Sequence, residues 1–195
     1  MTRNALLLTL LSVAVAFAAP KKPAIDPLTT FKTNDKILQD MLRRFPKETL
    51  SSNDSLRGHL GVMFGFGELG KRALGKAWVG KPKAEQDSFR VNFTKMVEKT
   101  ALQNPQDYLS DSSVSVLVGK VSDTATIRST VYRGANKVLV TYKLYADGPI
   151  WRIYDLKVGD KPSQVEKYRN QFTQYFKKKK TFSDLVGTIK KNAAN

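Results

Sequence analysis

The glycine-rich run at residues 65–70 is the first candidate for chemistry in this sequence. It has the spacing G-x-G-x-x-G, which in a βαβ unit cradles the pyrophosphate of a dinucleotide. The residues before it, with Leu60, Met63 and Phe64 at helical spacing, predict a helix where that motif requires a strand. We therefore interpret the glycines as a tight helix-to-helix junction, with Phe64 and Phe66 directed to the interior.

Catalytic and metal-binding residue types are scarce. His59 is the single histidine, no Gly-x-Ser-x-Gly elbow accompanies it, and there is no cysteine. This composition leaves only an all-oxygen metal site open, and no Asp/Asn/Gly loop of the calcium-binding type occurs. No pair of carboxylates stands out by its spacing. We therefore expect a protein that is not an enzyme and that holds neither a metal nor a cofactor.

The N-terminus has the pattern of an export signal. Arg3 precedes an apolar run that starts at Ala5 and ends at Ala16-Phe17-Ala18, the small-residue pattern of a signal-peptidase site. This predicts a signal peptide at residues 1–18, removed near Ala18-Ala19, and an exported, soluble mature chain. A flexible, Pro- and Lys-rich lead-in is expected at 19–33, followed by a single domain at 34–195.

The chain is strongly basic, with a formal net charge of +16. Lysines are consecutive at Lys21-Lys22, at Lys177 to Lys180 and at Lys190-Lys191. Such a surface attracts anionic lipid headgroups, acidic protein patches or nucleic acid, or it simply keeps the protein soluble. Because the chain is exported and has no nucleic-acid-binding motif, we expect no nucleic-acid partner.

The periodicity changes part-way along the chain. Apolar residues recur at spacings of three and four at 37–45, 56–64 and 69–78 and in a helix that begins at Pro82, and then at spacings of two at 114–118, 125–131, 138–144 and 150–158. Turn residues fall at 119–123, 134–136 and 147–149. Two amphipathic helices close the chain. This order predicts an α+β fold in which a four-stranded antiparallel meander packs with N-terminal and C-terminal helices.

The stretch 151–172 is the most informative part of the chain. It begins with an aromatic-rich strand, for which alternation places Trp151, Ile153 and Asp155 on one side and Tyr154 and Leu156 on the other. A short turn then leads into a helix that Pro162-Ser163 opens. The strand has the pattern Trp-x-x-Tyr-Asp and the helix the pattern Tyr-Arg-x-Gln-Phe.

These patterns resemble the C-terminal signature of the MlaC/toluene-tolerance family of periplasmic lipid-binding proteins. A second stretch, 63–102, resembles the family's upstream run at Arg72, Leu74, Gly75, Trp78, Pro82, Phe89 and Phe93. The sequence departs from the family at Gly65, where an acidic residue is usual, and in the turn, where Lys161 and Gln164 replace Gly and Leu. If that turn requires a positive φ, Lys161 strains it or Pro162 reroutes it.

The resemblance implies a soluble periplasmic carrier that binds a phospholipid, or a related lipid, by its acyl chains in an apolar cavity between sheet and helices. It further implies a monomer that exchanges lipid with an MCE-type ABC transporter complex at the inner membrane and a lipoprotein complex at the outer membrane. Arg72, Lys161 and Arg169 are candidates for the headgroup. The candidate lipid-binding residues are Phe64, Phe66, Leu69, Leu74, Trp78, Phe89, Phe93, Val97, Tyr132, Tyr142, Trp151, Tyr154, Tyr168 and Phe172.

Two alternatives stay open. Each of these aromatic residues also fits ordinary core packing of helices on a sheet, and Arg169 also fits a structural role as a cap or as a partner of Asp155. The protein as a whole also fits a basic, exported interaction protein that docks on an acidic partner or a membrane surface and has no lipid cavity.

Overall fold

A computed structural model describes residues 25–45, 53–101 and 108–194. The predicted signal peptide at 1–18 lies outside these residues. The elements, in chain order, are α1 (Pro27–Arg44), α2 (Asp54–Met63), α3 (Phe66–Leu74), the 3₁₀ turn η1 (Gly75–Trp78), α4 (Lys83–Ala101), β1 (Ser112–Val121), β2 (Thr124–Arg133), β3 (Asn136–Asp147), β4 (Ile150–Val158), α5 (Gln164–Lys177) and α6 (Phe182–Ala194).

The first helix starts earlier than the sequence predicted. A lead-in was expected as far as residue 33, but α1 begins at Pro27. Pro27 occupies the first turn, where its missing N–H costs nothing, and the Asp26 carboxylate accepts hydrogen bonds from the backbone N–H groups of Leu28 and Thr29, at 2.9 and 3.0 Å. The prediction of the lead-in's end was therefore wrong, because the cap lies upstream of the apolar residues that marked the helix.

The sheet has the predicted topology. Its strands run in the order β1-β2-β3-β4, and each neighbouring pair is antiparallel. The first turn is shorter than predicted: β1 continues to Val121 and only Ser122 and Asp123 connect it to β2. Gly119, expected in that turn, instead follows a bulge after Leu117. Glycine patterns therefore located the end of this strand poorly, because a bulge and a turn favour the same residue.

The predicted faces of β4 are wrong beyond Ile153, because the strand contains a second bulge. Leu144 pairs with Ile153, but Lys143 pairs with Asp155, so that Tyr154 is an extra residue in β4. Strict alternation would place Leu156 and Ile153 on opposite faces of the sheet. Because one inserted residue reverses the alternation, Leu156 faces the same concave side as Ile153.

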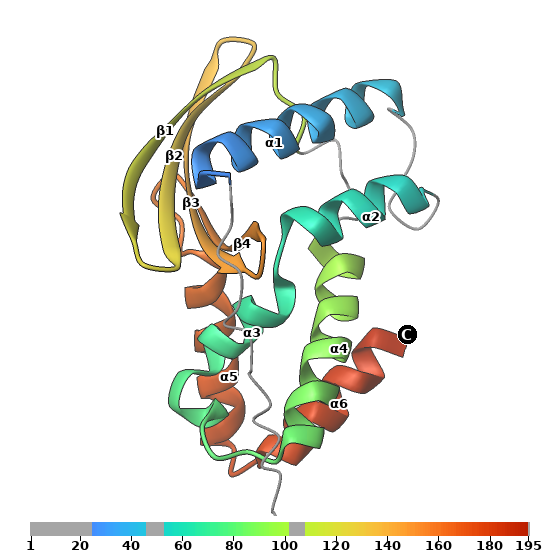
Figure 1. Ribbon diagram of the computed structural model, residues 1–195. Helices are drawn as coiled ribbons and strands as arrows, with labels where there is room; N and C mark the ends of the chain where they lie inside the picture. Colours follow the sequence, from blue (N-terminus) through green and yellow to red (C-terminus); the bar gives the residue numbers. More distant parts are fainter. Residues whose placement is uncertain (1–24, 46–52, 102–107, 195) are drawn as a thin grey trace, which may run out of the picture.

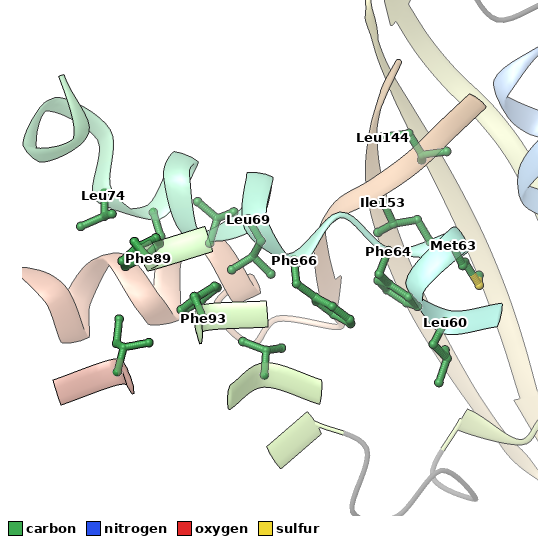
Figure 2. Packing of buried hydrophobic residues seen from close by; sticks show 14 of the residues in the cluster. Leu60, Met63, Phe64, Phe66, Leu69, Leu74, Phe89, Phe93, Leu144 and Ile153 are labelled. Carbon is green, nitrogen blue, oxygen red and sulfur yellow. The ribbon is translucent and has the colours of Figure 1, made fainter. Parts of the chain in front are cut away.

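One continuous apolar core joins the sheet to the helices. Figure 1 shows α1 lying across the concave side of the sheet, while α3, α4, α5 and α6 form a separate layer below it. In Figure 2, Phe64 and Phe66 lie between Ile153 on the sheet side and Phe89 on the helical side. The buried side chains of the two layers therefore form one continuous core, and the 64–66 segment connects them. Among the described helices, none has the length and apolar character needed to cross a membrane.

The glycine run has the structural role that we inferred. Gly65 lies between α2 and α3, and its N–H donates to the Ile153 carbonyl at 2.8 Å. A Cβ at Gly65 would meet the Tyr145 ring at 2.5 Å, and one at Gly70 would meet Phe89 and Phe93 at 2.7 Å. Gly65 and Gly70 are thus needed because aromatic rings lie directly against the backbone at these two positions.

Candidate functional site

A first cavity lies between α1 and the concave face of the sheet. We call it the sheet cavity, and its volume is about 210 Å³. Its walls are mostly apolar, with Asp35, Gln39 and Arg133 among the polar exceptions. The residues that line it are Asp35, Leu38, Gln39, Met63, Phe64, Tyr108, Ser110, Ser113, Ser129, Val131, Arg133, Val138, Val140, Tyr142, Leu156 and Val158.

A second cavity lies between β4 and the helices α3, α4 and α5. We call it the helix cavity, and its volume is about 280 Å³. The polar groups in its wall include Asp155 from β4 and Gln164 and Lys167 from the first turns of α5. The residues that line it are Phe64, Phe66, Leu69, Val97, Tyr108, Ile153, Tyr154, Asp155, Leu156, Gln164, Lys167 and Tyr168.

The two cavities adjoin each other. Phe64, Tyr108 and Leu156 line both of them, so the partition between the cavities consists of side chains and not of a sheet or a helix. The bulge at Tyr154 is what turns Leu156 into this position.

Two of the tyrosines in the cavity walls, Tyr142 and Tyr154, have a raised pKa. Burial raises the pKa of Tyr142 far above its ordinary value, and the nearby Asp35 carboxylate raises it further. Burial also raises the pKa of Tyr154. Both phenols therefore stay protonated at physiological pH, and each offers an apolar ring with one hydroxyl to a ligand.

The structure brings about half of the predicted lipid-binding residues to the cavities. Phe66, Leu69, Val97, Tyr154 and Tyr168 line the helix cavity, Tyr142 lines the sheet cavity, and Phe64 lines both. They come from α3, α4, α5 and three strand or loop positions, which are far apart in the sequence.

Other predicted residues lie in an aromatic cluster inside the helical layer. Phe89 and Phe93 stack with ring centroids 5.2 Å apart, and both are completely buried. Trp78 packs edge-on against Phe89 at 5.8 Å, and Phe172 packs edge-on against Phe93 at 5.9 Å. These four side chains close the core, which was the alternative that the sequence left open for them. Phe172 also borders, with Leu74, an outer groove between α3 and α5.

Trp151 and Tyr132 lie away from both cavities. The Trp151 indole Nε1 donates to the Ile25 carbonyl at 3.1 Å and so pins the start of α1 to β4. Lys120 Nζ lies 5.4 Å from the centre of the Trp151 ring. Tyr132 is 36% exposed near the end of β2.

Two of the predicted headgroup residues are engaged with the protein itself. Arg72 Nε donates to Glu68 at 2.9 Å, and its guanidinium lies 3.9 Å from the centre of the Tyr154 ring. Arg169 donates to the Arg72 backbone carbonyl at 3.1 Å. The sequence left open a pairing of Arg169 with Asp155, but the Asp155 carboxylate instead meets Lys143, at 3.7 Å, and the N–H of Val165.

The third headgroup candidate, Lys161, is exposed beside the helix cavity. It lines a surface pocket together with Gln164 and Lys167, both of which also line the helix cavity. The turn is not strained at Lys161, because the positive φ falls on Gly159, at 54°. Sequence reasoning missed Lys167, since nothing in the sequence distinguishes one exposed lysine of α5 from the others.

The described residues contain no cluster of three or more His, Asp or Glu side chains placed to hold a metal ion. His59 has a packing role, because its Nε2 lies 2.8 Å from the Asn34 carbonyl and links α2 to α1. The arrangement of the site is therefore two largely apolar spaces, whose walls also contain hydroxyls and the charged residues Asp35, Arg133 and Asp155, with lysines at one margin. Such a site suits the enclosure of an apolar ligand.

Comparison with known proteins decides the family. Residues 32–191 match the family model described as MlaC protein. The chain belongs to the MlaC family. This confirms the resemblance that the two motifs indicated. The phospholipid-binding protein from Ralstonia solanacearum, solved in complex with a phospholipid, has the same fold, with a TM-score of 0.71 and 18% identity over 87% of this chain and 98% of that chain. No curated protein matches.

Proposed function

We propose that this MlaC-family protein carries a phospholipid by its acyl chains, with the chains in the sheet cavity and the helix cavity. The observation that carries the proposal is the shared partition of Phe64, Tyr108 and Leu156 between two largely apolar spaces. Two adjoining apolar spaces suit a two-chain lipid, with one chain in each. The Ralstonia solanacearum relative, a phospholipid-binding protein solved with a phospholipid, supports the same ligand class.

The energetics favour enclosure of the chains. Each methylene exposed to water costs about 0.8 kcal/mol, so a lipid with some tens of methylenes does not cross an aqueous space unescorted. The cavities measure about 210 and 280 Å³, and together they fall within the range of about 300 to 1,000 Å³ that small-molecule sites occupy. The carrier therefore has to bury the chains, while the headgroup can stay in water.

The headgroup is assigned to the lysine margin of the helix cavity. Lys167 borders both the helix cavity and the surface pocket next to it, and Lys161 borders that pocket. A phosphate there would accept charge-assisted hydrogen bonds. Arg72 and Arg169, which are held by Glu68 and by a backbone carbonyl, shape the neighbouring surface instead.

The family and the N-terminal sequence support a proposal for the cellular role. The export signal at residues 1–18 supports a periplasmic location. In that location the protein would exchange lipid between an MCE-type ABC transporter complex at the inner membrane and a lipoprotein complex at the outer membrane. This role requires no catalytic step, no metal and no cofactor.

Native mass spectrometry tests the proposal. Protein purified from an exporting host without added lipid should show a second mass series, offset by the mass of a phospholipid, and extraction should release that lipid. Delipidated protein should regain the series after incubation with liposomes. A single lipid-free mass both before and after this incubation would refute lipid carriage.

A further inference from the structure

The end of the helical layer farthest from the sheet gathers lysines. In Figure 1 the connection from η1 to α4 and the turn from α5 to α6 lie together at this end of the molecule. We call it the lysine tip, and it consists of residues 75–83 and 177–182. Its cations are Lys76, Lys81, Lys83, Lys177, Lys178, Lys179 and Lys180.

Direct contacts hold the two halves of the lysine tip together. Trp78 of η1 packs edge-on against Phe182 of α6 at 6.2 Å, and Lys81 Nζ lies 5.8 Å from the centre of the Phe182 ring. The Ser183 hydroxyl donates to the Glu85 carboxylate at 2.6 Å. The lysines of the two segments therefore share one surface in the folded protein.

The acidic residues near the lysine tip are already engaged. Asp87 pairs with Lys83 at 2.7 Å. Asp184 accepts hydrogen bonds from the N–H and hydroxyl of Thr181, both at 2.8 Å, and Glu85 accepts from Ser183. Within the described part of the chain, no carboxylate lies within ion-pair distance of Lys76, Lys81 or the run from Lys177 to Lys180.

An apolar residue projects from the middle of these lysines. Val79 is 74% exposed and stands between Lys76 and Lys81, in the segment that connects η1 to α4. Gly75 and Gly80, with φ of 53° and 73°, turn the backbone before and after Val79. Next to it lies an open groove with an apolar floor that includes Leu74 and Phe176.

The charged residues that line this groove are all cations. They are Lys76, Arg169 and Lys177. The cations of the lysine tip are lysines, which are compact charges on flexible stems and impose no fixed bidentate geometry on an anion. A diffuse anionic lipid surface is matched by such lysines with an exposed apolar residue among them.

We propose that the lysine tip docks the protein on an anionic phospholipid bilayer, with Val79 entering the headgroup region. The tip shares no lining residue with the sheet cavity or the helix cavity. Docking through it therefore does not involve the residues that line the two cavities. The inference does not rest on lipid carriage, because a lipid-free protein would dock in the same way.

Co-sedimentation with sucrose-loaded vesicles tests the docking surface. The probes are vesicles of phosphatidylcholine alone and of equimolar phosphatidylcholine and phosphatidylglycerol. The full mature chain should bind only the anionic vesicles, and less so as salt is raised. One lysine near an anionic membrane strengthens binding by roughly fivefold, so replacing Lys177 to Lys180 together with Gln should weaken binding by about several hundredfold.

The matched control removes the same number of charges elsewhere. Lys32, Lys36, Lys137 and Lys157 are exposed on α1 and the sheet, and a variant with all four replaced by Gln has the same net charge as the tip variant. It should keep most of its vesicle binding. Val79→Asp, which removes no lysine, should also weaken binding. Thermal unfolding followed by circular dichroism confirms that each variant is folded.

The outcomes separate the explanations. Selective loss in the tip variant and in Val79→Asp supports docking through the lysine tip. Equal loss in the tip variant and the control shows that net charge alone attracts the protein, and overturns the proposal. No binding of the full mature chain to anionic vesicles also overturns it, and leaves an acidic protein as the partner that the charge would fit.

Discussion

The carboxylate of Asp155 accepts a hydrogen bond from the backbone N–H of Val165 at 2.9 Å, although the Asp155 side chain is almost completely buried. The bond joins β4 directly to the first turn of α5. Ser163 and Glu166 complete that turn as a reciprocal capping box. The strand and the helix of the family signature are thus one hydrogen-bonded unit, and the divergent turn between them is not what holds them together.

Replacing Asp155 with Ala should therefore destabilise the fold. The change leaves the Val165 N–H buried without its acceptor and removes a favourable charge from the start of α5, at a cost of about 1 to 3 kcal/mol in the free energy of unfolding. Urea unfolding followed by tryptophan fluorescence measures it.

Asp160→Ala is the matched control, because Asp160 is exposed in the turn that precedes α5. It should change the free energy of unfolding by less than about 0.5 kcal/mol. Equal costs for the two variants would contradict the anchoring role of Asp155.

A larger side chain at the cavity partition should reduce lipid binding. Leu156→Trp places a ring where both cavities meet, so a bound lipid loses contact for part of its chains. Excluding only two methylenes costs about 1.6 kcal/mol, which weakens retention by more than about tenfold. Lipid bound per protein after gel filtration through lipid-free buffer measures the effect.

Leu139→Trp is the control for this variant, since Leu139 lies in the neighbouring strand and is 46% exposed. It should retain lipid as the unmodified protein does. If Leu156→Trp retained lipid equally well while folded, the partition would not be part of the binding site.

Gly70 should tolerate no side chain, whereas Gly58 should benefit from one. A Cβ at Gly70 would meet the fully buried rings of Phe89 and Phe93 at 2.7 Å, so Gly70→Ala should cost about 1 to 3 kcal/mol. Gly58 is exposed within α2 with open space around it, so Gly58→Ala should stabilise by about 0.5 to 1 kcal/mol. Midpoints of urea unfolding compare the two. Equal effects of the same sign would contradict the packing described for α3.

The sequence predicted the architecture because hydrophobic period is a local property. The change from helical to strand spacing near Pro105 and the turn residues between strands were sufficient to give an α+β meander with flanking helices. The predictions that were wrong also concerned local features of the chain. The bulge at Tyr154 reverses the faces of β4, and no single residue in the sequence announces it.

The candidate site was harder to predict than the fold. A buried phenylalanine on a helix looks the same in the sequence whether it lines a cavity, like Phe66, or fills a core, like Phe93. The difference depends on which rings happen to meet across α3, α4 and α5. Lys167 and Leu156 were missed for the same reason, because their importance comes from position between elements and not from residue type.

Asp35 should give the protein a stability that rises in mild acid. Burial raises the pKa of this carboxyl above its ordinary value of 3.8, and hydrogen bonds from Gln39 and Ser113 and the charge of Arg43 offset only part of that effect. Between the unfolded and the folded pKa, the folded state binds more protons than the unfolded state. The free energy of unfolding from this group therefore increases as the pH falls and is lost as the pH rises through the folded pKa.

Asp35→Asn removes this titration while keeping the shape of the side chain. At neutral pH the variant should be more stable than the unmodified protein, because it has no buried charge at the edge of the sheet cavity, and the difference should shrink as the pH is lowered toward about 4. Asp40→Asn, an exposed change on the same helix, controls for the loss of one negative charge. The measurement is urea unfolding across this pH range. If the stability of the variant relative to the unmodified protein instead increased toward acid, the Asp35 carboxylate would be stabilised, and not penalised, in the fold.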